Sequence, residues 1–440
     1  MTSEEFCFDW IVVGAGPSAM GLLHGLLGDT TRTTKVAIVE RGRATPGTPL
    51  ESWYVEAHRH TLQGRLGWRS IPVPLGRGLG GASTVNAGLC LQPSYDYLPG
   101  LRKAAMYIEQ QMRAHDCLMD HAEGIPLTRS RSGERRTYYD GLVRPIEQHQ
   151  VEWFTDSTVD RLLQRESGRV SGIALSDGRR LWSRREVILC AGAVGTPSLL
   201  YASGLLGGDS VPLRDHVLIP TLRWGAQEWR RSPNGVHMLQ YLTEDILVAV
   251  LEPTPTVVAG SVATIVPGLP WLIQGIVQML LATPVMWILR RCFTVVGVFM
   301  MNPHSEGELR FDGDEIQVNL PYFRDERDLA MAQQSVIASR AFFDRLLGGF
   351  ELFPGRWMPA FLLQRYIRAT CQPFFHYMST CRMGPNKDCP VDEDFGLRGV
   401  KGLRLCDASI LTGVKEPPAL TCASVGFLLA ERLAAETSEW

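Results

Sequence analysis

The hydrophobic pattern at the start of the chain has the order of a strand, a turn, a helix and a second strand. An apolar run from Trp10 to Val13 predicts a buried strand, and a helical stretch from Ala19 to Leu27 follows it. A second apolar run, Lys35 to Val39, predicts the next strand. The turn between the first strand and the helix reads Gly14-Ala15-Gly16-Pro17-Ser18-Ala19. Together these segments predict a βαβ unit.

The middle of the chain carries shorter apolar runs separated by turn residues. Asp177-Gly178 lies between two such runs and is a hairpin signal. The apolar run from Glu186 to Ala193 predicts a buried strand, and Gly195-Thr196-Pro197 is expected to open the helix after it. The short strands predicted before this point are Val151–Phe154, Val159–Gln164 and Val170–Leu175.

The remaining pattern divides the chain into domains. Residues 216–365 have longer strands and a predicted helix from Asp325 to Leu347. Afterwards a strand ends at Asp407, and a helix is expected from about Ala419 to Ala435. Residues 41–75 are expected to be an irregular excursion and residues 96–140 mainly helical. A chain of 440 residues is too long for one ordinary core, so we predict one domain from 1–215 and 366–440 with a second domain, 216–365, inserted in it.

Charge and cysteine usage exclude several classes of protein. Lysine plus arginine (44) nearly balances aspartate plus glutamate (46), so no basic field exists to bind nucleic acid. The arginines at 129, 131, 135 and 136 are interpreted as a solvated loop. The ten cysteines contain no CxxC pair, and no further ligand accompanies His58-Arg59-His60 at a useful spacing, so no metal site is expected.

The cysteines and the N-terminus also bear on location. Scattered cysteines are typical of reduced, buried thiols in a cytosolic protein. The chain begins with Glu4 and Glu5 and reaches its first strand by Trp10, which leaves no room for a signal peptide. We therefore expect a cytoplasmic protein.

One segment without charge could change that picture. No charged residue occurs from Pro253 to Leu289. The 13 residues between Pro270 and Pro284 would form about 20 Å of helix, less than the roughly 30 Å of bilayer hydrocarbon. A buried or lid helix beside an apolar substrate pocket is favoured, with a peripheral membrane contact through 267–289 as the alternative.

The glycine-rich turn carries the first candidate chemistry. Glycines allow a tight turn and a close approach to a pyrophosphate, and the N-terminus of the following helix supplies free N–H groups. Glu40 ends the second strand, 21 residues beyond Ala19, where a carboxylate can accept both ribose hydroxyls of an adenosine. An ADP-containing ligand is therefore expected. A second glycine loop, Gly78-Leu79-Gly80-Gly81-Ala82-Ser83, follows.

Asp407 gives a weaker signal for the rest of that ligand. An aspartate at the end of a strand and beside a helix N-terminus could bind the ribityl hydroxyls of a flavin dinucleotide. The alternative interpretation is a simple helix N-cap.

Four motifs in order resemble the glucose–methanol–choline (GMC) flavoprotein oxidoreductases. Ile11 to Gly21 is similar to the start of the family's FAD-binding domain, and the stretch from Gly76 to Asn86 to its flavin-side signature. Glu186 to Gly204 is similar to the second signature, and His376 to Gly384 to the catalytic histidine motif. The closing segment from Leu403 to Ala430 is similar as well.

The resemblance implies an α/β fold, with a Rossmann-like FAD-binding domain and an inserted antiparallel-sheet substrate domain. It also implies a set of residues that contact FAD: Gly14, Gly16, Pro17, Ser18, Glu40, Arg41, Gly78, Gly81, Ser83, Asn86, Ala87, Val159, Gly192, Asp407, Ala408 and Pro418. Some members tether FAD through a histidine, but Val85 stands at the position that could correspond, so FAD is expected to be bound non-covalently.

The chain departs from the family pattern at the second catalytic position. The family pairs its histidine with a second His or Asn just before a proline in the closing segment. Matching Pro418 and Thr421 to that pattern places Pro417 at the position of the second residue. Proline offers neither a donor nor a base. The adjacent Glu416 is the candidate replacement if the backbone shifts. Ser379 also stands where the family usually has glycine.

His376 is the candidate base for alcohol oxidation, because a histidine suits proton removal near neutral pH. Its aromatic neighbours Phe374, Phe375 and Tyr377 could exclude water and keep the imidazole neutral. A structural core histidine is the alternative, which the resemblance disfavours.

Three hypotheses for function follow. The first is FAD-dependent oxidation of an alcohol on a lipophilic substrate, with an electron acceptor that the sequence does not identify. The second is other flavin chemistry on the same scaffold, namely desaturation or a redox-neutral isomerisation, elimination or decarboxylation. The third is a binding protein that retains the cofactor without turnover.

Overall fold

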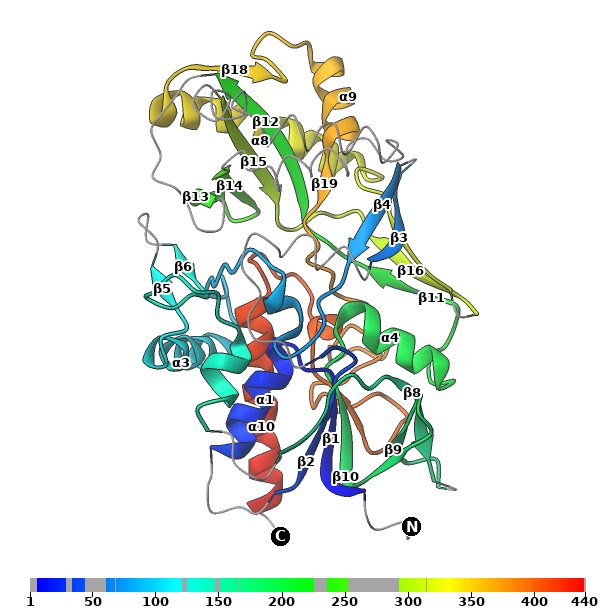
Figure 1. Cartoon of the computed structure of the whole chain (residues 1–440). Helices are drawn as coiled ribbons and strands as arrows, with labels where there is room; N and C mark the ends of the chain where they lie inside the picture. The colour runs from blue at the N-terminus through cyan, green and yellow to red at the C-terminus, as the bar shows by residue number, and fades with distance from the viewer. Residues whose placement is uncertain are drawn as a thin grey trace.

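The computed structural model describes most of the chain (Figure 1). The described residues are 6–28, 34–43, 61–67, 69–120, 125–146, 151–165, 167–224, 236–251, 293–313 and 315–438. The uncharged segment from Pro253 to Leu289 and the His58-Arg59-His60 group lie outside them.

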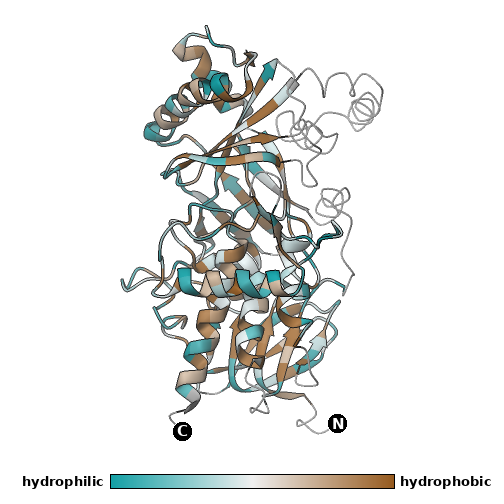
Figure 2. Ribbon diagram, turned by 90° about the vertical axis from the view of Figure 1, so that its left-hand side faces the viewer, coloured by the Kyte–Doolittle hydropathy of each residue, from teal (hydrophilic) through white to brown (hydrophobic). Residues whose placement is uncertain are grey.

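A seven-stranded sheet holds the two ends of the chain together in the lower half of Figure 1. Its central strands β1 (Cys7–Val13) and β10 (Arg180–Leu189) are parallel, and β20 (Leu403–Leu405) pairs with β10. The other members are β2 (Val36–Val39), β7 (Val151–Phe154), β8 (Val159–Gln164) and β9 (Val170–Leu175). Figure 2 shows these strands largely in hydrophobic colours, as expected for a parallel sheet covered on both faces. The predicted strands and the Asp177-Gly178 hairpin are confirmed.

Two helices from opposite ends of the chain pack against each other beside this sheet (Figure 1). They are α1 (Pro17–Leu27) and α10 (Ala419–Ser438). A Cβ atom added to Gly21 would lie 1.8 Å from the carbonyl oxygen of Ala423, and one added to Gly426 would lie 1.9 Å from that of Ser18. Only glycine permits so close an approach between the two backbones.

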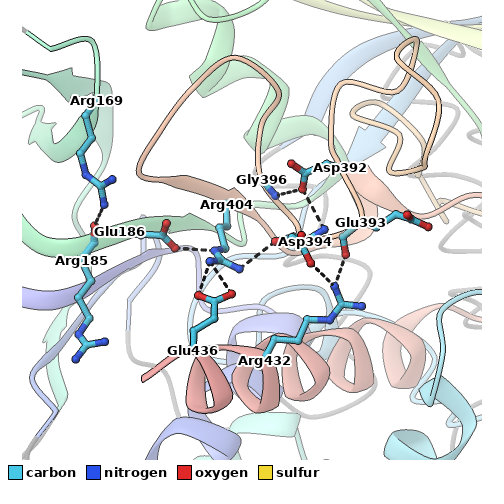
Figure 3. Close-up of polar contacts among 10 residues, drawn as sticks. All are labelled: Arg169, Arg185, Glu186, Asp392, Glu393, Asp394, Gly396, Arg404, Arg432 and Glu436. Carbon is cyan, nitrogen blue, oxygen red and sulfur yellow. Dashed lines mark hydrogen bonds and ion pairs between the residues drawn. The ribbon is translucent and has the colours of Figure 1, made fainter. Parts of the chain in front are cut away.

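Ion pairs also join the C-terminal elements to the sheet (Figure 3). Arg404 on β20 binds Glu186 on β10 at 2.6 Å and Glu436 on α10 at 2.7 Å. Arg432, one turn before Glu436 on α10, pairs with Asp394 at 3.1 Å. Arg404 is only 12% exposed, so its two carboxylate partners offset its desolvation.

A six-stranded antiparallel sheet forms the other end of the molecule, far from both termini (Figure 1). Its strands are β12 (Val217–Trp224), β13 (Val236–Thr243), β14 (Ile246–Leu251), β15 (Phe293–Met300), β18 (Phe350–Phe353) and β19 (Gln372–Pro373). The helices of this part are α8 (Glu326–Leu347) and α9 (Ala360–Thr370). Asp325 caps α8 by accepting the N–H of Arg327, which explains why that helix begins where the sequence predicts it.

A third sheet lies between the other two and corrects one expectation. Its strands are β11 (Ser210–Leu213), β16 (Gly307–Asp312), β17 (Glu315–Leu320), β3 (Thr61–Leu66) and β4 (Arg69–Pro74). Residues 61–74 were expected to be irregular, so the prediction for 41–75 is wrong there: β3 and β4 form a hairpin, and β3 pairs in parallel with β17. The pairing partner lies about 250 residues away, which local pattern cannot indicate.

Three local predictions also differ from the structure. Residues 96–140 contain one α-helix, α3 (Leu101–Ala114), then β5 (Met119–Asp120), β6 (Pro126–Leu127) and the start of a π-helical turn, Tyr139–Val143, so the mainly helical prediction is wrong. Helix α4 (Gly192–Ala202) begins three residues earlier than expected and contains Pro197. Arg129 and Arg135 are buried, not solvated.

The described residues also bear on membranes and metals. No helix among them combines the length and apolarity needed to cross a bilayer. Within the same ranges, no three His, Cys, Asp or Glu side chains gather as metal ligands.

The contact between α1 and α10 yields a prediction for stability. Gly21→Ala places a methyl group against the Ala423 backbone, so the free energy of unfolding should fall by more than about 2 kcal/mol. Gly207→Ala is the matched control, because a Cβ there meets nothing within 4 Å, and its effect should stay within about 0.5 kcal/mol. Chemical denaturation of the two variants measures the difference; equal stabilities would contradict the close contact.

Candidate functional site

The two glycine loops lie against each other at the carboxyl end of β1. Gly14 has a φ of +101°, and a Cβ there would lie 2.3 Å from the carbonyl oxygen of Cys190. A Cβ on Gly81, whose φ is +52°, would lie 2.7 Å from Cα of Gly16. The second loop continues into a 3₁₀ turn, Gly81–Thr84. Glycine is therefore required where the loops turn and touch.

The Glu40 carboxylate is hydrogen-bonded to the backbone of both glycine loops. Its Oε2 accepts the N–H of Ala15 at 3.0 Å, and its Oε1 accepts the N–H groups of Gly42 at 2.8 Å and Gly78 at 3.0 Å. The side chain is buried. A carboxylate accepts about four hydrogen bonds, so Oε2 has room for a hydroxyl. Its contact with a ribose stays a prediction, and the structure adds a role in holding the loops.

The N-terminus of α1 is open for an anion. Gly16 occupies the N-cap position without a side-chain hydrogen bond, Pro17 follows it, and Ser18 is buried. The first N–H groups of the helix therefore lack a side-chain cap, which is the arrangement that binds a pyrophosphate.

Asp407 joins two helix starts. It accepts N–H groups from Gly192 at 2.9 Å and from Ser409 at 2.8 Å, and it accepts the hydroxyl of Thr196. It caps the 3₁₀ turn η4 (Ala408–Ile410), as the N-cap interpretation expected. Burial raises the pKa of its carboxyl group, and these hydrogen bonds oppose that effect. The contact with FAD stays a prediction here too.

The other predicted FAD residues come from the same part of the fold. The Asn86 Oδ1 accepts the N–H of Gly88, and Arg135 donates to Asn86, which gives that buried arginine its place beside the second loop. Arg41 lies close enough to Arg77 that burial and this like charge lower its pKa. The remaining positions are Ser83 in the 3₁₀ turn, Ala87 after it, Val159 at the start of β8 and Pro418 just before α10.

These residues fit FAD. Gly192, the first residue of α4, has a φ of +81°, and a Cβ there would meet nothing within 4 Å, so space is open beside the start of α4. Two touching glycine loops, an uncapped helix N-terminus and a buried acid at the end of β2 complete a cradle for an ADP group.

A pair of histidines lies where the lower and upper sheets meet. The Nδ1 atoms of His216 and His376 are 2.9 Å apart, and the two rings meet edge to face. The Nε2 of His216 lies 2.8 Å from the carbonyl oxygen of Val414. His216 stands just before β12, and His376 follows β19, so 160 residues separate the partners.

The Val414 carbonyl fixes the protons on both rings. A carbonyl only accepts, so Nε2 of a neutral His216 must carry the proton, and its Nδ1 is then an acceptor. Nδ1 of His376 must therefore donate, which leaves Nε2 of a neutral His376 without a proton. Among the described residues no partner occupies that atom. The pair thus presents a bare imidazole nitrogen.

Asp215 supports the backbone that carries His376. Its Oδ1 accepts the N–H of His376 at 2.7 Å, and its Oδ2 accepts the N–H of Phe375 at 3.2 Å and the hydroxyl of Tyr322 at 2.8 Å. Phe375 has a φ of +60°, a conformation that costs energy for an aromatic residue and needs such support. Burial raises the pKa of Asp215 to about 7.

Burial also keeps both imidazoles neutral. It lowers the pKa of His216 to about 4. The pKa of His376 is lowered well below its ordinary value, first by burial and then by the neighbouring His216. Both rings are therefore neutral at pH 7, as the protonation pattern requires.

Aromatic and aliphatic side chains line this place. The rings of Phe374 and His376 are 4.2 Å apart, and Phe299 on β15 lies 4.5 Å from Phe374. An apolar cluster continues from there to the second glycine loop; it includes Leu89, Leu127, Leu218, Leu239, Leu247, Met301 and Ala87. The surroundings of the histidine pair are thus largely apolar.

The structure does not bring Glu416 to His376. The Glu416 carboxylate is fully buried and accepts hydrogen bonds from Ser94, from the Tyr97 hydroxyl at 2.7 Å and from the Thr421 hydroxyl at 2.8 Å. Burial raises its pKa, and these bonds oppose that effect. Pro417 is buried beside it and contributes no polar side-chain atom.

The polar side chain that contacts the His376 ring is His216. Neither Asp215 nor His216 was among the residues predicted for the site. No local sequence pattern pairs His216 with His376, because 160 residues separate them.

Comparison with known proteins agrees with this geometry. Residues 100–217 and 303–426 match the N-terminal and C-terminal models of the GMC oxidoreductases, together more than half of the chain. The chain is 23% identical over 527 residues to an oxygen-dependent choline dehydrogenase of Cronobacter sakazakii, covering 92% of this chain and 90% of the relative. It is 24% identical over 494 residues to an (R)-mandelonitrile lyase-like protein of Arabidopsis thaliana, covering 92% and 86%.

The fold has a close counterpart among solved structures. The pyridoxine 4-oxidase from Mesorbium loti superposes with a TM-score of 0.75 at 19% identity, over 97% of this chain and 99% of that one. This likeness supports the α/β fold with an inserted antiparallel sheet.

The placement of Glu416 yields a prediction. Glu416→Gln replaces an acceptor oxygen by an amide donor among three donating residues, so the free energy of unfolding should fall by about 1–3 kcal/mol. The acid limb of the pH–rate profile should not move, since the carboxylate does not contact His376. Glu244→Gln, at a side chain that is 91% exposed, is the control. A shifted limb in Glu416→Gln alone would return Glu416 to the mechanism.

Proposed function

Because this chain belongs to the GMC oxidoreductases, whose cofactor is FAD, we propose that it oxidises an alcohol group on an apolar substrate, with His376 as the base. The observation that carries the proposal is the hydrogen-bonded chain from Val414 through His216 to His376, which leaves Nε2 of His376 free to accept a proton. FAD, when bound, supplies the acceptor for the hydride that leaves the carbinol carbon.

The histidine pair can take up a proton without losing its geometry. When Nε2 of His376 gains a proton, its Nδ1–H still donates to the neutral His216, so the new positive charge is shared along a strengthened hydrogen bond. Asp215 holds the His376 backbone N–H throughout. His216 therefore serves as a positioning residue that sets the tautomer of His376.

An apolar substrate follows from the surroundings of the pair. Phe374 and Phe299 belong to one apolar cluster that extends to Ala87. Burying apolar substrate surface there contributes roughly 25 cal/mol per Å². Apolar side chains of this kind also exclude water, which strengthens the hydrogen bonds of His216 and His376.

A second reaction type has one observation in its favour. Pro417 provides no hydrogen bond to an alkoxide-like oxygen, a loss of about 2.7–4 kcal/mol by the precedent of oxyanion holes. A redox-neutral reaction on the same scaffold avoids that demand, and the relatives include a mandelonitrile lyase-like protein. This alternative keeps His376 as the proton acceptor.

The experiment that tests the proposal is anaerobic mixing of the holoenzyme with a series of apolar primary alcohols. We expect the alcohols to bleach the oxidised flavin, and their methyl ethers, which lack the hydroxyl proton, to leave it oxidised. Product formed without bleaching would support the redox-neutral alternative. A perturbed flavin spectrum without any product would instead indicate a binding protein.

Removal of the base is the second test. His376→Ala should retain FAD and lose at least roughly a hundredfold in turnover, the usual contribution of a general base. His115→Ala, at an exposed position just after α3, is the control and should keep full turnover. Near-normal turnover in His376→Ala would remove His376 from the mechanism.

The lowered pKa values predict the shape of the pH profile. A base whose pKa lies well below 6.5 is deprotonated at neutral pH, so the titration of His376 should not change kcat/KM there and should lower it only as the pH drops through the lowered pKa. His216→Ala removes one cause of the lowering and the acceptor for Nδ1 of His376. The acid limb should therefore move to higher pH and kcat should fall. An unmoved limb would mean that His216 does not position His376.

A further inference from the structure

Several large apolar side chains of β18, α9 and the segment between them are exposed. Figure 1 shows these elements at the end of the molecule farthest from both termini. Trp357 is 92% exposed, Phe361 62% and Phe350 56%. We name this surface the aromatic face and define it by Trp224, Leu346, Phe350, Phe353, Trp357, Phe361 and Leu362. A soluble protein surface rarely gathers so many large apolar groups without a partner.

These residues belong to adjoining elements. Phe350 on β18 pairs with Trp224 at the end of β12, and the chain continues from β18 directly to α9. On α9, Leu363 and Ile367 are buried in the core, while Phe361 and Leu362 point outward. The exposed groups are therefore additional to the side chains that hold the helix in place.

Charge around the aromatic face is mainly positive. Residues 341–368 contain arginines at 345, 356, 365 and 368 and acids only at 344 and 351. Asp344 already pairs with Arg223 and Arg356, and Glu351 pairs with Arg340. No described carboxylate pairs with the exposed Arg345 or Arg365. Arginines around exposed aromatic groups suit anionic headgroups above an apolar layer.

The uncharged part of the sequence joins the chain at the same end of the sheet. Strand β14 ends at Leu251, and β15 begins at Phe293, which lies opposite Trp224 on β12. From Pro253 to Leu289 the sequence between these strands has no charged residue. This part of the sequence is apolar and contains no acid.

We propose that the aromatic face docks on the surface of a lipid bilayer, with its aromatic side chains in the interface and its arginines on anionic headgroups. A second copy of the chain is the less suitable occupant, because a two-fold contact would bring the unpaired arginines of both copies together. The inference goes beyond the proposed reaction and does not depend on which chemistry the flavin site performs.

The docking also has a geometric consequence. Strand β12 runs from Val217, next to His216, to Trp224 on the aromatic face. Eight residues of strand span about 26 Å, so the histidine pair would lie at most about that distance from the end of β12 at the aromatic face. The aromatic face would thus hold the enzyme on the membrane without inserting the reaction site in it.

Sedimentation of the holoenzyme with phospholipid vesicles tests the proposal. We expect the wild-type protein to bind vesicles of phosphatidylcholine with phosphatidylserine, and to bind phosphatidylcholine alone more weakly. The double variant Trp357→Ser/Phe361→Ser should bind at least roughly tenfold more weakly. Met106→Ser is the matched control, because Met106 is 67% exposed on α3, outside the aromatic face, and its variant should bind like wild type.

The arginines are tested separately. Arg345→Gln/Arg365→Gln should lose the preference for phosphatidylserine and its salt dependence while keeping the weaker binding to phosphatidylcholine. An unchanged flavin spectrum in every variant shows that the fold is intact.

Three results would overturn the proposal. They are no binding to either vesicle, equal binding of wild type and Trp357→Ser/Phe361→Ser, or dimerisation that this double variant abolishes while vesicles stay unbound. Because the flavin bleaching test uses no vesicles, failure of the proposed reaction and failure of the docking are seen independently.

Discussion

A single buried carboxylate, that of Asp215, sits at the crossing between the flavin-side sheet and the antiparallel sheet. It accepts hydrogen bonds from the backbone of Phe375 and His376 and from Tyr322, which follows β17. An unsatisfied buried acceptor of this kind would cost several kcal/mol, so each of its partners is held in place. The strained backbone at Phe375, the position of His376 and hence the pairing with His216 all depend on this one group.

The chemistry of the site depends on two imidazole rings that burial keeps neutral. Burial lowers the pKa of both imidazoles, and the Val414 carbonyl then determines which nitrogen of each ring carries the proton. Low polarity strengthens these hydrogen bonds and penalises any alternative arrangement. The protein thus prepares a base through backbone geometry and desolvation, and no carboxylate in the described part of the chain is hydrogen-bonded to the imidazole ring of His376.

How far the sequence could predict this protein depends on the range of the interactions. The βαβ unit and the start of α8 at Asp325 are local features, and the sequence predicted both. The pairing of β3 with β17 and the contact of His216 with His376 join residues far apart in the chain, so neither leaves a local pattern. The position of Glu416 could not be predicted for the same reason, because its hydrogen-bond partners Ser94 and Tyr97 lie more than 300 residues away in the sequence.

The close approach of α1 and α10 has a consequence for biosynthesis. Strand β20 completes the sheet that contains β1, and α10 packs against α1. At Gly21 and Gly426 the backbones of the two helices are so close that no Cβ atom fits between them. The amino-terminal segment therefore emerges from the ribosome long before the residues that cover it. Until the residues of β20 and α10 have been synthesised, the edge of β10 and the face of α1 that they cover stay exposed in the nascent chain, and exposed apolar surface of this kind favours aggregation.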